Sequence, residues 1–293
     1  MPLFKIFHPV TEKECAMFTD CHIHVDSYDA TELKAALERA REKGVARFIG
    51  VGQDLISSKL TVAAAVDNDG LYAGVGVHPW YADSVRSDTI EQLKEMAQSS
   101  KKLVCIGEVG LDYQEAVQPS SEQSIALAPA RQIPVEVQRE VFVGLIKMAK
   151  TLKLPLNVHT HRTSSNDVLD ILGREGADQV GGMIHGFQAN EKWAAKVWEL
   201  GFYISVGLPS VHPEAERVRS VLKNIPLERI VFDSDSPATL IKTVEGPYPL
   251  EMDKRNEPAN LRFIAENLAQ IKGLALEEVE QTVSNNVRRL FRI

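Results

Sequence analysis

The sequence has few cysteines and lacks a long apolar run. Its three cysteines cannot all pair, and their spacing is not that of a Cys-x-x-Cys zinc site. No stretch reaches the ~18 consecutive apolar residues that predict a membrane span, and residues 1–16 mix charged residues and proline too early for the apolar core of a signal peptide. These absences predict a protein of a reducing compartment, the cytoplasm, with no membrane association.

An excess of positive charge is absent too. The chain has 33 Lys and Arg against 40 Asp and Glu, a net charge of −7, so no global attraction draws it to a polyanion. Contact with a nucleic acid or another phosphodiester would have to be local. The chain also lacks a Pro-, Gly- or Ser-rich linker. This predicts a single domain over residues 1–293 with residues 1–16 as an extension, and nothing in the sequence indicates an obligate protein partner.

What the sequence does contain is a regular alternation of short apolar, β-rich runs with segments of helical periodicity. This alternation is typical of α/β proteins with a parallel sheet, and the length fits a barrel of ~250 residues with additions. Eight such units favour a closed (β/α)8 TIM barrel over an open doubly wound sheet. The predicted strands are residues 17–24, 47–52, 71–78, 103–110, 154–161, 181–187, 202–207 and 230–237.

The predicted helices carry ordinary start and stop signals. Asp29 can cap the first helix, with Glu32 three residues on, and Gly44 ends it. Pro258 fits the first turn of a helix that runs to about Lys272, and further helices are predicted over 189–200 and 276–290. Two stretches, 114–134 and 238–257, exceed the usual loop length after a strand and are expected to rise over the barrel mouth.

Metal-competent side chains stand at the C-terminal ends of the predicted strands, where barrel enzymes place their active sites. Alternate residues of a strand face the same side, so the two imidazoles of the HIH triplet can reach one cation. A carboxylate inside the apolar run VCIGEVG needs a cation or a hydrogen-bond partner. Each residue alone has a simpler explanation, such as a buried ion pair, a hydrogen-bonded histidine or a turn-capping aspartate, but together they indicate a metal site. The set comprises His22, His24, Glu108, His159, His185 and Asp235.

Six nitrogen and oxygen ligands are more than one zinc ion with an open position needs. They predict one or two divalent cations, and two would lie ~3.5–4 Å apart, bridged by a carboxylate and activating a shared hydroxide. Imidazoles suit Zn²⁺ and carboxylates tolerate Mn²⁺ or Mg²⁺, so the identity stays open. His78, at the end of the third strand, is either a substrate contact or a structural histidine. Asp20, Asp26 and Asp112 are candidates for orienting the ligands.

Several motifs, taken in order, resemble one family. DCHIHVD, GVHP, IGEVGLDY, LPLNVHTHR, IHGF and DSDSP are similar to the motifs of the TatD-type metal-dependent deoxyribonucleases, a branch of the amidohydrolase-like barrels, and the resemblance extends from about Phe18 to the C-terminus. It implies hydrolysis of DNA phosphodiesters. It also implies that His22, His24, Glu108 and Asp235 hold one cation and that Glu108, His159 and His185 hold the other, with Glu108 as the bridge and Asp235 as general base.

The chain departs from the family pattern beside the fifth strand. Where the family usually has His-Ser-Arg, the sequence reads His159-Thr160-His161-Arg162, so the arginine expected to meet a phosphate is displaced by one position. Such a shift turns a side chain to the opposite face of a strand. Either His161 takes over the substrate contact, or the strand has ended and Arg162 reaches back.

Three functions are therefore compared. The leading prediction is a TatD-like deoxyribonuclease or phosphodiesterase. The first alternative is a metal-dependent ester or amide hydrolase, such as the relatives that remove D-amino acids from mischarged tRNA, because the same hydroxide can attack a carbonyl carbon. The second alternative is a non-catalytic binding protein that keeps the fold, against which the intact ligand set argues.

Overall fold

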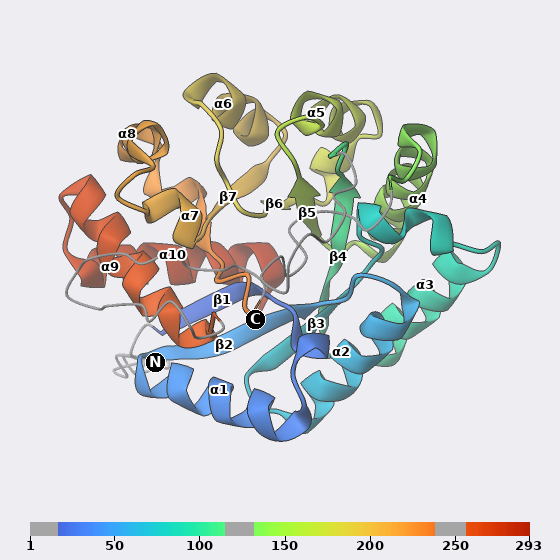
Figure 1. Cartoon of the computed structure of the whole chain (residues 1–293), viewed down its shortest axis with the longest axis horizontal. Helices are drawn as coiled ribbons and strands as arrows, with labels where there is room; N and C mark the ends of the chain where they lie inside the picture. Colours follow the sequence, from blue (N-terminus) through green and yellow to red (C-terminus); the bar gives the residue numbers. More distant parts are fainter. Residues whose placement is uncertain (1–16, 115–131, 238–255) are drawn as a thin grey trace, which may run out of the picture.

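Eight parallel strands form one sheet in which each strand pairs with its neighbour in the sequence, from β1 to β8. The computed structural model describes residues 17–114, 132–237 and 256–293, and Figure 1 shows the strands surrounded by helices. The strands are β1 (Phe18–Ile23), β2 (Val45–Val51), β3 (Leu71–Val75), β4 (Leu103–Leu111), β5 (Leu156–Thr160), β6 (Gly182–Ile184), β7 (Phe202–Val206) and β8 (Ile230–Phe232).

The sheet closes where the segment after β8 meets β1. Ile23 and Ser236 form a parallel bridge, the His24 amide donates to the Ser236 carbonyl at 2.8 Å, and the Asp235 amide donates to the His22 carbonyl at 3.1 Å. The predicted (β/α)8 barrel is thereby confirmed.

Helices follow the strands and cover the outside of the barrel. They are α1 (Ala30–Glu42), α2 (Leu55–Asp67), α3 (Thr89–Ser99), α4 (Val135–Leu152), α5 (Ser165–Arg174), α6 (Glu191–Glu199), α7 (Leu208–Val211), α8 (Glu216–Asn224), α9 (Leu261–Lys272) and α10 (Leu276–Phe291). Short 3-10 turns are η1 (Val25–Ser27), η2 (Pro79–Ser84), η3 (Ala177–Gln179), η4 (Leu227–Arg229) and η5 (Pro258–Asn260). No helix in the described part of the chain is long and apolar enough to cross a membrane.

The local signals act as the sequence predicts. The Asp29 side chain accepts hydrogen bonds from the Thr31 and Glu32 amides and so caps α1, and Gly44, at φ +84°, leads the chain out of that helix. Pro258 lies in the 3-10 turn that leads into α9.

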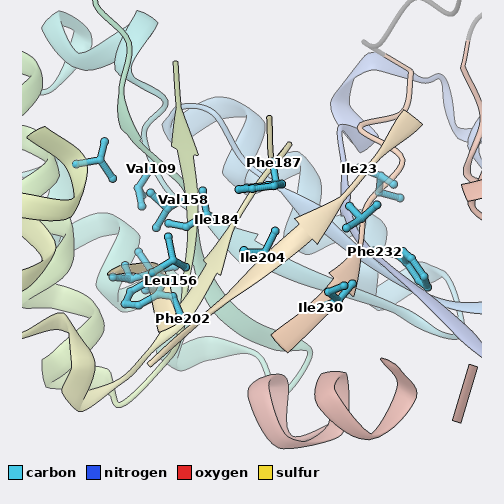
Figure 2. Close-up of a cluster of buried hydrophobic side chains, with 14 of the residues drawn as sticks. Ile23, Val109, Leu156, Val158, Ile184, Phe187, Phe202, Ile204, Ile230 and Phe232 are labelled. Atoms are coloured by element: carbon cyan, nitrogen blue, oxygen red, sulfur yellow. The ribbon is translucent and has the colours of Figure 1, made fainter. Parts of the chain in front are cut away.

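The larger hydrophobic core lies between the strands and the outer helices. Figure 2 shows Leu156, Ile204, Ile230 and Phe232 among its buried side chains, and Ile23 belongs to the same cluster. Ile23 therefore packs outward while its neighbours His22 and His24 serve the interior, as the alternation in a strand requires.

A second cluster joins strand residues to α10, including Val231 of β8 and Val287 and Phe291 of the helix. The Asn286 amide donates to the carbonyls of Leu227 and Ile230, which precede or begin β8. These contacts fix α10 at the N-terminal ends of the strands, so the opposite end of the barrel is left for the site.

Three strands end three or more residues earlier than the sequence predicts. β3 ends at Val75, β6 at Ile184 and β8 at Phe232, whereas the predicted runs continue to 78, 187 and 237. Beyond the ends of β6 and β8 the backbone takes positive φ, at Gly186 (φ +60°) and Asp235 (φ +55°), which regular strands do not adopt. The predicted loops 114–134 and 238–257 fall mostly on residues 115–131 and 238–255, outside the described residues, as does the extension 1–16. The prediction of a single domain over the whole chain stays a prediction.

Candidate active site

A cavity of about 400 Å³ opens at the C-terminal ends of the strands. Its lining comes from strands spread around the barrel, so residues far apart in the sequence face one space. Among the lining residues are His24, His78, Glu108, His159, His185 and Asp235. We call this space the site cavity. Of the six predicted ligands it exposes five, and the sixth, His22, lies buried directly beneath.

The two histidines of β1 point at a common position. The Nε2 atoms of His22 and His24 lie 3.4 Å apart, and the Glu108 Oε2 atom lies 3.7 Å from the first and 3.9 Å from the second. The Asp235 Oδ1 atom lies 3.1 Å from the His24 Nε2 atom. Oε2 of Glu108 is buried and makes no hydrogen bond with the described residues. A buried carboxylate oxygen beside two imidazole nitrogens fits the donor set of a divalent cation.

The other oxygen of Glu108 faces different imidazoles. Its Oε1 atom lies 3.1 Å from the His159 Nδ1 atom and 3.7 Å from the His78 Nε2 atom. The candidate ligand atoms therefore fall into groups whose members lie within 4.8 Å of one another. Glu108 belongs to two of these groups: one that it forms with His22 and His24, and one that it forms with His78 and His159.

His185 is turned by an aspartate that follows β8. Its Nδ1 atom donates to the Asp233 Oδ2 atom at 2.7 Å, which leaves Nε2 directed toward the Asp235 Oδ1 atom at 3.8 Å. The His185 ring stacks on the His22 ring with centroids 3.8 Å apart. His185 is thus grouped with His22 and Asp235 in the structure. The family resemblance implies a different grouping, in which His185 shares a cation with Glu108 and His159.

A buried asparagine two residues before His159 orients His22. Asn157 donates through Nδ2 to the Cys21 carbonyl at 2.9 Å, which turns its Oδ1 atom toward the His22 Nδ1 atom, also at 2.9 Å. His22 therefore carries its proton on Nδ1 and presents a free Nε2 lone pair. The sequence analysis missed Asn157, although an amide inside the apolar run LPLNV, on the same strand face as His159, requires such a partner.

His78 has the opposite tautomer. Its Nδ1 atom accepts from the Trp80 amide at 3.2 Å, so the ring proton lies on Nε2, the atom that faces Glu108. A nitrogen that carries a proton has no lone pair for a cation. His78 is therefore arranged as an N–H donor into the site cavity.

The profile of the family described as TatD related DNase matches residues 19–292, nearly the whole chain. The chain belongs to this family. It is 32% identical to the uncharacterized metal-dependent hydrolase YabD of Bacillus subtilis, over 94% of this chain and 98% of the relative. It is 30% identical to the human deoxyribonuclease TATDN3, over 93% of each chain. Among solved structures, the TatD homologue YJJV of Escherichia coli superposes with a TM-score of 0.81 at 25% identity, covering 95% of this chain and 99% of that one.

Membership of the TatD family supports the leading prediction, a metal-dependent hydrolase of the deoxyribonuclease family, over the two alternatives that the sequence left open. The departure from the TatD pattern after β5 is visible in the structure. His161 lines the site cavity, with its Nδ1 atom 2.8 Å from the Thr163 hydroxyl and 3.8 Å from the Asp112 Oδ1 atom. Arg162, beyond the end of β5, is exposed and lines a neighbouring cavity instead.

The three aspartates considered as orienting residues differ in role. Asp112 accepts from the Trp80 indole at 2.9 Å and faces the His159 Nε2 atom at 3.3 Å, so it braces that imidazole. Asp20 accepts from the Ser234 amide at 2.9 Å and so ties β1 to the segment after β8; its burial raises its pKa to about 8. Asp26 makes no described hydrogen bond or ion pair with a predicted ligand and acts on His24 only through its charge. Asp233, which the sequence analysis did not single out, orients His185.

Electrostatics in this TatD site keep the central carboxylates charged. Burial opposes ionisation of Glu108, but the imidazoles of His78, His22 and His159 outweigh it and hold its pKa well below the usual range. Burial is likewise overcome at Asp235, where His185 and His24 lower the pKa. Negative charge at the centre of the cavity favours binding of a cation.

The imidazoles divide into two classes. Burial lowers the pKa of His22 to about 4 and that of His78 to about 3, so both are neutral at neutral pH. Burial also acts on His159 and His185, but neighbouring carboxylates outweigh it and raise their pKa values to about 9 and about 10. A cation that binds these two histidines must displace a proton from each.

Proposed function

We propose that the chain is a deoxyribonuclease that hydrolyses phosphodiester bonds with two divalent cations. The observation that carries the proposal is the division of Glu108, whose two oxygens face separate sets of imidazoles. A carboxylate in this arrangement is suited to bridge two cations. The described donors, imidazole nitrogens with buried carboxylate oxygens, fit Zn²⁺ and also Mn²⁺ or Mg²⁺.

In this proposal His22, His24, Glu108 and Asp235 hold one cation, and Glu108, His159 and His185 hold the other. His22 offers the Nε2 lone pair that Asn157 leaves free, and His185 offers the Nε2 atom that its bond to Asp233 leaves free. His159 shares a proton with Glu108, and a cation on that side takes the place of this proton.

Bound cations would lower the pKa of a water molecule and stabilise the negative charge that develops on the phosphate. The protein provides the remaining parts of the reaction. Asp235 is the most exposed of these carboxylates, with its side chain 25% accessible against 3% for Glu108, and it is ionised, so it can accept the proton of an attacking water as general base. His78 donates its Nε2 proton to a phosphate oxygen, and His161 and Arg162 contact the strand beyond.

The substrate class rests on the family and on the shape of the mouth. The human relative is named a deoxyribonuclease, and the site cavity has the size of small-ligand sites, which ordinarily measure ~300–1,000 Å³. A single nucleotide unit with its phosphate fits such a space, so a single-stranded end or segment is the favoured form of DNA.

The test combines metal content per chain with hydrolysis of a labelled single-stranded DNA, with and without EDTA. We expect one or two metals per chain and cleavage that EDTA abolishes and that Mn²⁺, Mg²⁺ or Zn²⁺ restores. A metal-loaded chain that cleaves neither single-stranded nor duplex DNA refutes the proposal. If that chain releases D-amino acids from aminoacyl esters in a metal-dependent way, the function is carbonyl hydrolysis instead.

A further inference from the structure

A second cavity of about 590 Å³ adjoins the site cavity. The two spaces share Thr160, His161, Gly186 and Gln188 in their walls. The second one continues over the loops that follow β5 and β6 to the start of α8; α5, α6 and α8 lie next to one another along the upper edge of Figure 1. A chain that leaves the site cavity on this side passes directly into it.

Two arginines line this second cavity, and among the described residues no carboxylate does. Arg162 comes from the loop after β5 and Arg217 from the first turn of α8. Neither guanidinium group forms a hydrogen bond or an ion pair with any described residue, although the Arg162 carbonyl accepts from the Ser165 hydroxyl at 3.2 Å. In a chain with 40 acidic and 33 basic residues, two guanidinium groups without described partners make this cavity locally positive. We call this space the arginine cavity.

Part of the wall of the arginine cavity is apolar. Ile184 and Phe187 are buried there, and Trp193, 7% exposed, is held by a hydrogen bond from its indole Nε1 to the Ser165 carbonyl at 3.3 Å. The side chains of Asn166 and Gln188 add exposed amides at the rim. An apolar wall, amide groups and two guanidinium groups match the three parts of a nucleotide, its base face, its polar edges and its phosphate.

We propose that the arginine cavity binds the nucleotide adjacent to the scissile phosphate, with Arg162 and Arg217 holding its phosphate. The substrate is then a single strand of at least two nucleotides that runs from the site cavity into the arginine cavity. This proposal also explains why the arginine after β5 is displaced by one position from the family pattern. Arg162 binds the neighbouring phosphate and not the scissile one. The inference rests on the proposed nuclease function and names the part of the strand outside the metal site.

The first experiment measures binding without hydrolysis. A labelled single-stranded oligonucleotide is titrated by fluorescence anisotropy in EDTA at several salt concentrations, with R162A, R217A and the control K223A, which removes an exposed charge elsewhere on α8. We expect R162A and R217A each to weaken binding about tenfold. Each should also reduce the slope of log K against log salt, by ~0.7 for the two together because they hold one phosphate of a single strand. K223A changes neither quantity. If R217A binds like K223A, the inference is wrong.

The second experiment separates this inference from the proposed function. Metal-loaded protein is assayed on bis(4-nitrophenyl) phosphate, which occupies only the site cavity, and on the oligonucleotide. We expect the loss of kcat/KM in R162A and R217A to be at least about tenfold larger for the oligonucleotide. An equal loss on both substrates overturns the arginine cavity and leaves the nuclease intact. If the wild type hydrolyses neither substrate, the nuclease proposal fails and the binding titration alone decides on the arginine cavity.

Discussion

Replacing Asn157 by alanine tests whether the protein positions its candidate metal ligands through their outer hydrogen bonds. Asn157 is fully buried, and the substitution leaves both the His22 Nδ1 proton and the Cys21 carbonyl without a partner. Each unsatisfied buried group costs ~1–3 kcal/mol, so the free energy of unfolding of the metal-free protein falls by ~2–6 kcal/mol. Because His22 also loses its fixed tautomer, metal affinity falls ~10–100-fold.

Asn286→Ala is the matched control. Asn286 is equally buried and donates to two carbonyls, those of Leu227 and Ile230, but at the opposite end of the barrel. It should cost a similar amount of stability and leave metal affinity unchanged. Asn157→Asp keeps an acceptor for the His22 proton and should recover part of the lost affinity.

Urea unfolding of the metal-free variants and calorimetric metal titration of the folded proteins provide the two readouts. The reasoning is refuted if Asn157→Ala binds metal as tightly as Asn286→Ala does. It is also refuted if both variants lose affinity to the same extent, because the effect would then follow from general destabilisation.

Two further predictions concern the ligands. Glu108→Ala removes the carboxylate that faces both sets of imidazoles, so the chain should lose at least one bound cation, as measured by elemental analysis. Its DNA hydrolysis should fall by more than the roughly 10–100-fold that loss of a residue orienting a ligand costs. An unchanged metal count would contradict the bridging role. Metal affinity should weaken as pH falls from 9 to 6, by up to about tenfold per pH unit for each proton displaced, because the raised pKa values of His159 (about 9) and His185 (about 10) keep both protonated there. His22, with its pKa near 4, adds no pH dependence in that range, and a dissociation constant that does not vary with pH would refute the proton competition.

The sequence predicted the barrel because each strand carries its own evidence. An apolar run followed by a helical period is a local pattern, and eight repetitions determine which ends of the strands face the same side. For the same reason the candidate ligands could be named, since each stands at the end of its run. The alternation rule correctly placed Ile23 in the outer core while His22 and His24 face Glu108.

What the sequence could not supply are contacts between strands. The partner of His22 lies 135 positions away in Asn157, and nothing in either segment specifies that pair. The convergence of Arg162 and Arg217 on one cavity likewise depends on how α8 packs over the barrel. Beyond the early ends of β6 and β8 the backbone takes positive φ at Gly186 and Asp235, and an aspartate with positive φ is not recognisable from composition.

The closure of the barrel has a consequence for how the protein is made. The seam joins the first strand to the segment after the eighth, and the hydrogen bonds across it run through His22, His24, Asp235 and Ser236. During synthesis from the N-terminus, the two histidines leave the ribosome more than two hundred residues before the aspartate that faces them. A nascent chain therefore carries an incomplete set of ligands until its last barrel strand has emerged. Assembly of the cation site therefore depends on closure of the barrel, which comes late in synthesis.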